Sequence, residues 1–262
     1  RDQAIVGEEI AIDGRDVANL TLRLQPGMTI SGRITFDGTS APPADLTKTQ
    51  LSFGAVPTSS SPLELAMSSV TGGNAATTAA DGTFTVKGIV PGRYRGSVGG
   101  GASAVCAMHM GGAPQPNNWT LKSMMWNGRD IADVPFDVKP NEDITGVVVS
   151  FTDRATELSG TLFDQTGHAT GNFPIVVFST DKAYWTIGSR RVQQARPASD
   201  GKFKIAGLPA GEYVMCAVTD LDPEDLYNPV FLDQLMSAGG YKIRLGDGQK
   251  LVQDLKLAGG GF

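Results

Sequence analysis

The chain is poor in the residues that carry most protein chemistry. Its 262 residues include two histidines and two cysteines, and only 19% are charged. Hydrolytic catalysis most often needs a histidine within reach of a nucleophile. His168 lies in a turn-like stretch, and Cys106 and His109 would point to opposite faces of a strand. We therefore expect no catalytic dyad and no enzymatic activity.

Metal and phosphate motifs are also lacking. There is no cysteine pair of zinc-site spacing and no glycine-rich phosphate loop that opens a helix. Oxygen ligands suit Ca²⁺, and one loop is crowded with carboxylates, although its spacing does not follow the EF-hand pattern: Asp220, Asp222, Glu224 and Asp225. We expect no cofactor, with Ca²⁺ at this loop as the alternative left open.

Basic surface and long apolar runs are absent as well. The formal net charge of −5 argues against a nucleic-acid partner, because nucleic-acid-binding proteins carry basic patches. No apolar run approaches the ~18 residues that a bilayer-spanning helix requires, so we expect no membrane-spanning segment. Cys106 and Cys216 fall in different halves of the chain, and both are expected to be small buried side chains.

The chain does contain an internal repeat, within a composition rich in turns, with 33 glycines and 15 prolines. Residues 81–95 align with residues 200–214 without a gap, at an offset of 119 (200 − 81). Each copy has an Asp-Gly turn, an alternating strand, a Gly- and Pro-containing turn and a strand with tyrosine. We interpret the copies as hairpin-like units with these turn and core residues: Asp81, Gly82, Phe84, Gly88, Gly92 and Tyr94, and Asp200, Gly201, Phe203, Gly207, Gly211 and Tyr213.

The repeat predicts an all-β chain of two tandem β-sandwiches, residues 27–152 and 153–262, built from short strands separated by turn residues. One short helix is expected, with Asn228 as its N-cap and Pro229 in its first turn, packed against a sandwich edge. The linker 152–156 is short, which predicts a fixed and elongated arrangement with a modest interface.

Residues 1–26 are predicted to be the closing strands of a truncated upstream repeat, because residues 14–20 echo residues 128–134. Their apolar face of Leu20, Leu22 and Leu24 needs a cover. It would either fold back along the first sandwich, which we favour because a short tether raises effective concentration, or add as a strand to a neighbouring chain and build a homo-oligomer.

Two groups of aromatic residues leave alternatives open. Tyr184 and Trp185 fall in a loop close to Arg190, where exposed rings could bind a sugar; in the alternative, which we favour, Trp185 packs against the core. Trp119 and Trp126 are seven positions apart (126 − 119), so that both cannot face inward on a straight strand. One of them is expected to be partly exposed.

The second copy of the repeat, together with the strand Leu158-Ser-Gly-Thr-Leu162, resembles the carboxypeptidase regulatory-like domains. The resemblance implies transthyretin-like β-sandwiches of large secreted or envelope-associated bacterial proteins, where such domains are accessory or adhesive. We therefore expect a non-enzymatic structural, spacer or adhesion module, extracellular or in the cell envelope. Its partners would be other protein chains or cell-surface polymers; the alternative function is carbohydrate binding.

Overall fold

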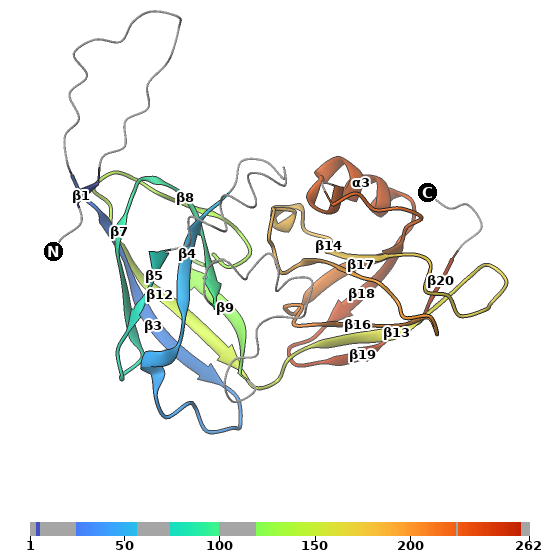
Figure 1. Cartoon of the computed structure of the whole chain (residues 1–262), viewed down its shortest axis with the longest axis horizontal. Coiled ribbons are helices and arrows are strands. Elements are labelled where there is room, and N and C mark those ends of the chain that lie inside the picture. The colour runs from blue at the N-terminus through green and yellow to red at the C-terminus, as the bar shows by residue number, and fades with distance from the viewer. Residues whose placement is uncertain (1–3, 6–24, 57–73, 100–118, 224, 258–262) are drawn as a thin grey trace, which may run out of the picture.

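The computed structural model describes residues 4–5, 25–56, 74–99, 119–223 and 225–257, and its strands form two β-sandwiches joined end to end (Figure 1). The all-β prediction is confirmed. Leu20, Leu22, Leu24, Cys106 and His109 lie outside the described residues. Of the N-terminal stretch the structure describes β1 (Ala4–Ile5) and β2 (Gln25–Pro26), which pair with each other in an antiparallel manner.

The first sandwich has a six-stranded sheet of order β10-β9-β12-β3-β7-β6 and a four-stranded sheet of order β11-β8-β4-β5. A 3₁₀ turn, η1 (Leu46–Lys48), precedes β4. The strands are β3 (Met28–Asp37), β4 (Leu51–Ala55), β5 (Asn74–Ala75), β6 (Thr77–Thr78), β7 (Thr83–Ile89), β8 (Gly92–Val98), β9 (Thr120–Trp126), β10 (Arg129–Asp130), β11 (Phe136–Val138) and β12 (Ile144–Thr152).

The second sandwich has two four-stranded sheets, β16-β13-β19 with β20 also on β13, and β15-β14-β17-β18. Its helical segments are η3 (Lys182–Tyr184), η4 (Asp225–Tyr227) and α3 (Pro229–Ser237). The strands are β13 (Glu157–Phe163), β14 (Ile175–Ser179), β15 (Val192–Ala195), β16 (Lys202–Ala206), β17 (Gly211–Ala217), β18 (Tyr241–Leu245), β19 (Lys250–Val252) and β20 (Leu255–Lys256).

In both sandwiches the first strand runs parallel to the closing strand, β3 beside β12 and β13 beside β19. A glycine in the first strand makes room for this. A Cβ at Gly32 would stand 1.9 Å from the carbonyl oxygen of Val147, and one at Gly160 would stand 2.0 Å from that of Gln253. The glycine of each Ser-Gly pair thus has a steric reason, since a Cβ at that position would collide with the backbone of the closing strand.

The repeat itself is not a hairpin, so that part of the prediction is wrong. β7 and β16 each pair with the opening strand of their sandwich, whereas β8 and β17 belong to the opposite sheet. The motif is an arch that crosses from one sheet to the other. Gly88 and Gly207 turn it with φ of 77° and 76°. In the second copy the tyrosine stabilises the arch, because the Tyr213 hydroxyl donates to the Pro209 carbonyl oxygen at 2.5 Å.

The aromatic residues of the repeat fill equivalent places in two separate cores, as expected. Phe84, Tyr94, Phe203 and Tyr213 are all buried, and each phenylalanine lies opposite the glycine of the opening strand. Trp119 is also buried, while Trp126 packs on the first core only partly buried. The prediction that one of these tryptophans is partly exposed is confirmed.

A third apolar layer covers the outer face of the sheet β15-β14-β17-β18. All five residues of β14 are buried, and Leu232 and Leu235 of α3 pack on this face together with Cys216. The helix begins as predicted, with the Asn228 side chain accepting from the Val230 amide. Its predicted position at a sandwich edge is wrong, because strands with both faces apolar need a cover over the sheet face.

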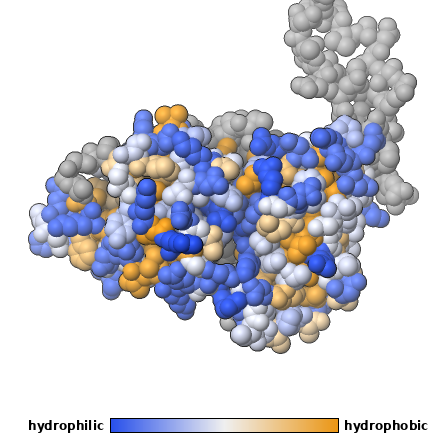
Figure 2. All heavy atoms as spheres, turned by 180° about the vertical axis from the view of Figure 1, so that it is seen from behind, coloured by the Kyte–Doolittle hydropathy of each residue, from blue (hydrophilic) through white to orange (hydrophobic). Residues whose placement is uncertain are grey.

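Figure 2 shows the back of the molecule, where hydrophilic and hydrophobic residues are interspersed. In the described part of the chain, the helices are all too short or too polar to cross a membrane.

Candidate functional site

An extended set of polar contacts lies where the two sandwiches meet. β12 ends at Thr152 and β13 begins at Glu157, so that residues 153–156 alone connect the sandwiches. Three groups of polar contacts bridge this joint, each with partners on both sides. We take the joint, defined by these contacts, as the candidate functional site.

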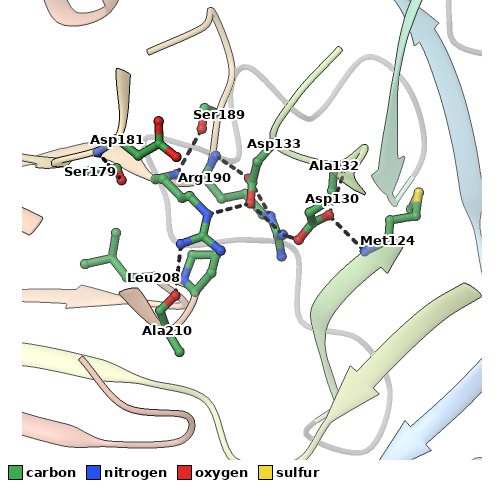
Figure 3. Close-up of polar contacts among 12 residues, drawn as sticks. Met124, Asp130, Ala132, Asp133, Ser179, Asp181, Ser189, Arg190, Leu208 and Ala210 are labelled. Carbon is green, nitrogen blue, oxygen red and sulfur yellow. Dashed lines mark hydrogen bonds and ion pairs between the residues drawn. The ribbon is translucent and has the colours of Figure 1, made fainter. Parts of the chain in front are cut away.

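The first contact centres on Asp133, whose side chain is fully buried in the turn that follows β10. One carboxylate oxygen accepts from the backbone amide and Nε of Arg190, both at 3.0 Å. The other accepts from Arg190 Nη2 at 2.9 Å and from Arg191 Nε at 3.2 Å (Figure 3). A carboxylate of the first sandwich is thus enclosed by two arginines of the second.

Asp130 supports the same contact from β10. Its Oδ2 accepts from Arg190 Nη2 at 2.9 Å, and its Oδ1 accepts from the amides of Met124 and Ala132. Burial raises the pKa of Asp130 above its ordinary value, although the Arg190 guanidinium acts in the opposite direction. Burial also disfavours the charge on Arg190, but Asp133 and Asp130 outweigh it and raise the pKa of Arg190.

Arg191 ties the joint to the arch of the second sandwich. Its Nη1 donates to the Ala210 carbonyl oxygen at 2.9 Å and to the Tyr213 hydroxyl at 3.3 Å, and its guanidinium lies 4.4 Å from the ring centroid of Tyr184. Burial raises the pKa of Tyr213 to about 12. A Cβ at Gly211 would stand 2.9 Å from Arg191 Nη1. Gly211 lacks the predicted turn conformation, since its φ is not positive, and the close approach is to the flexible end of the Arg191 side chain.

Arg95 on β8 makes the second contact, with the loop before Arg190. Its guanidinium donates to the Ile187 carbonyl oxygen and, at 3.0 Å, to the Thr186 hydroxyl, which in turn donates to the Asp133 carbonyl oxygen. Desolvation lowers the pKa of Arg95 to about 10. The loop 186–191 is therefore held at both of its ends by the first sandwich.

A third and more exposed contact lies on the linker side. Lys122 on β9 pairs with Asp37 of β3 and, at 2.5 Å, with Asp247 in the turn before β19. Arg154 of the linker pairs with Asp37 at 3.1 Å. Asp153 accepts from the amides of Thr39 at 2.9 Å and Ser40 at 2.7 Å, so that the linker is fastened to the loop after β3.

The structure places the three residues of the expected sugar site in different surroundings. Trp185 is 5% exposed, packs edge-on against Phe178 and donates from Nε1 to the Ser179 carbonyl oxygen at 2.7 Å. The favoured alternative, in which Trp185 packs against the core, is therefore confirmed, and the exposed ring that a sugar site would need is not found at this position. Arg190 lies in the joint, and Tyr184 contacts Arg191 at the edge of the cleft between the sandwiches.

Sequence reasoning missed Arg95, Asp130, Asp133 and Arg191 as members of one site. Residues 128–134 stood out only because they echo residues 14–20. Asp133 and Arg190 are 57 positions apart, and nothing in the periodicity of either segment predicts that they meet.

The acidic loop shows no ion site in the described residues. Asp220 accepts from the Leu221 amide and Asp225 from the Asn228 side chain, while residue 224 lies outside the description. Among the residues that the structure covers, no three histidine, cysteine or acidic side chains are grouped closely enough to hold a metal.

The sequence matches no protein-family model and none of the curated proteins. Among solved structures, a minor pilin of Streptococcus agalactiae is 11% identical with a TM-score of 0.29, and the match covers 88% of this chain and 95% of the pilin. A group B streptococcus pilus 2b backbone protein is 12% identical with a TM-score of 0.29, covering 87% and 90%. The Bacillus anthracis TIE protein is 10% identical with a TM-score of 0.26; the match covers 90% of this chain but 37% of that protein's length. At these TM-scores the likenesses carry no inference about this chain.

Proposed function

We propose that this chain is a non-enzymatic structural module, a rigid spacer or adhesion unit whose two sandwiches are held in one fixed orientation. The observation that carries the proposal is the buried ion-pair joint. Asp133 is wholly enclosed, and its carboxylate binds two arginines of the opposite sandwich. Removing one partner of such a pair costs about 3–5 kcal/mol, because it leaves a buried charge uncompensated, so the docked joint requires Asp133 to face these arginines.

The linker supports the same proposal. Its residues are bonded to both sides: Asp153 to the first sandwich, and Thr156 through its hydroxyl to the Leu208 carbonyl oxygen of the second. A linker fastened in this manner acts as a spacer element and not as a free tether.

We further propose the domain limits 27–152 and 153–262, with residues 1–26 as part of a preceding repeat, and membership of the carboxypeptidase regulatory-like, transthyretin-like domains. The support is the repeated arch and the Ser-Gly opening strands. Such a module would act outside the cytoplasm of a bacterium, between other protein chains or cell-surface polymers. Antibody labelling of intact cells tests this location, and labelling only after lysis would contradict it.

The rigid joint is tested by residual dipolar couplings on the intact chain. If the proposal is right, one alignment tensor fits the amides of both sandwiches. Arg190→Met leaves Asp133 and Asp130 without their shared cation, so we expect two different tensors in that variant. Lys204→Met is the matched control, because Lys204 pairs with Glu157 inside the second sandwich.

Two results would contradict the spacer proposal. One is a pair of unequal tensors in the wild-type chain. The other is an Arg190→Met variant that stays folded and keeps a single tensor, since the ion-pair joint would then not be what fixes the orientation.

Carbohydrate binding remains the alternative proposal, but not through Trp185. A sugar site would have to use other residues, and a glycan array with the intact chain tests it directly. Binding that survives Tyr184→Ala would place such a site away from the joint.

A further inference from the structure

A cleft of about 500 Å³ lies between the two sandwiches, beside the joint. Both sandwiches and the linker contribute to its walls: β9 and the β9–β10 turn on one side, the arch 207–210 on the other, and residues 154–156 along the linker. The volume is within the ~300–1,000 Å³ typical of ligand pockets, which occur preferentially at domain interfaces.

The charged residues of the cleft leave an excess of positive charge. Four of its lining residues are basic and two are acidic, but three of the basic ones are themselves paired with carboxylates, Lys122 and Arg154 with Asp37 and Arg191 with Asp133. Asp130 accepts from Arg190, and Asp247 from Lys122. Arg129 is exposed on the β9–β10 turn, and Arg154 shares Asp37 with Lys122. The basic members are Lys122, Arg129, Arg154 and Arg191. Among the described residues Arg129 is the lining cation that has no acidic partner, and its exposed guanidinium attracts a ligand of negative charge.

The walls between these charges are largely apolar. Leu121 and Met125 of the first sandwich and Pro209 of the arch are partly exposed in this lining, and Val134 and Leu208 lie buried beneath it. A purely ionic ligand would leave this surface unused, whereas a ligand that places an aliphatic group beside an anion contacts both. The combination favours a peptide over a sugar, whose body is covered with hydroxyl groups.

We propose that the cleft binds a segment of another protein chain in which an Asp or Glu carboxylate stands beside an aliphatic side chain. The carboxylate binds at the basic rim of Arg129 and Arg154, and the aliphatic group contacts Met125 and Pro209, which are partly exposed. This inference rests on the proposed rigid joint, because the cleft exists only while the two sandwiches are docked.

The test is an amide chemical-shift titration of the intact chain with the peptide acetyl-Ala-Leu-Glu-Ala-amide. We expect shifts at Ala155, Thr156 and Gly207, which line the cleft. The matched peptide with Gln in place of Glu should bind about tenfold more weakly, since it lacks the charge-assisted bond. Equal binding of the two peptides, or shifts outside the cleft, would overturn the proposal. So would binding of an oligogalacturonate in the cleft without binding of the peptide.

Arg129→Gln removes the rim cation and should weaken the acidic peptide about tenfold. Arg33→Gln is the control, since Arg33 is exposed on β3 away from the cleft. An Arg129→Gln variant that binds the acidic peptide with unchanged affinity would contradict the inference. A wild-type chain with a single alignment tensor but no peptide binding refutes this inference alone, whereas unequal tensors refute the rigid joint and the cleft together.

Discussion

At the residue scale, the buried phenylalanine of the repeat contributes measurably to the free energy of unfolding. Phe203 is buried in the second core and packs over Gly160 of the opening strand. Phe203→Ala should lower the free energy of unfolding by about 3–5 kcal/mol, because it removes apolar contacts and leaves a cavity. Urea denaturation followed by circular dichroism measures this. A loss below about 1 kcal/mol would mean that the core collapses around the site and that Phe203 does not organise it.

Asp130 gives the joint a pH dependence opposite to that of most carboxylates. Its folded-state pKa lies above the ordinary value of 3.8, so its ionised form is disfavoured by folding. The stability contributed by this group therefore falls as the pH rises from 3.8 through the folded-state pKa. Asp130→Asn removes that dependence, and the wild-type advantage over the variant should shrink with rising pH. Denaturant titrations at several pH values check the sign, and an advantage that grows with pH would refute it.

At the element scale, the arch depends on one backbone conformation. Gly207 has a φ of 76°, and a Cβ there would meet no atom within 4 Å. Gly207→Ala should therefore cost about 1–2 kcal/mol from backbone strain alone, and Gly88→Ala the same in the first sandwich, where φ is 77°. Thermal unfolding measures both. Unchanged melting temperatures would show that the arch relaxes into another conformation.

The strands and the repeat could be predicted from the sequence, but the partners of the strands could not. Alternation and turn residues report local backbone geometry, and a Gly- and Pro-containing turn serves a hairpin and an arch equally well. The apolar layer on the outer face of the sheet β15-β14-β17-β18 could have been predicted from the sequence. Residues 175–178 are Ile-Val-Val-Phe, an unbroken apolar run typical of a strand buried on both faces. The joint left no such signal, because its members are distant in sequence and polar.

At the scale of the whole molecule, the linker contributes its own acid sensitivity. Hydrogen bonds from Ser40 and Thr39 lower the pKa of Asp153 to about 2 from 3.8. The stability it provides is present above pH 3.8 and is lost as the pH falls towards 2. Asp153→Asn should lower the free energy of unfolding near neutral pH, where the wild-type carboxylate is ionised, and the difference from the wild type should shrink as the pH falls from 3.8 towards 2. A variant profile that runs parallel to the wild type below pH 3.8 would contradict the role assigned to this carboxylate.

The parallel pairing of opening and closing strands has a mechanical consequence. β3 and β12 are neighbouring parallel strands. A pull applied at the start of β3 and the end of β12 therefore acts along the strands, at right angles to the hydrogen bonds that join them. Such a load shears the ladder, so its hydrogen bonds share the tension and none is peeled open first. The same holds for β13 and β19. Forced unfolding is governed by the unfolding barrier and not by equilibrium stability, so each sandwich is built to carry tension along the line of the chain.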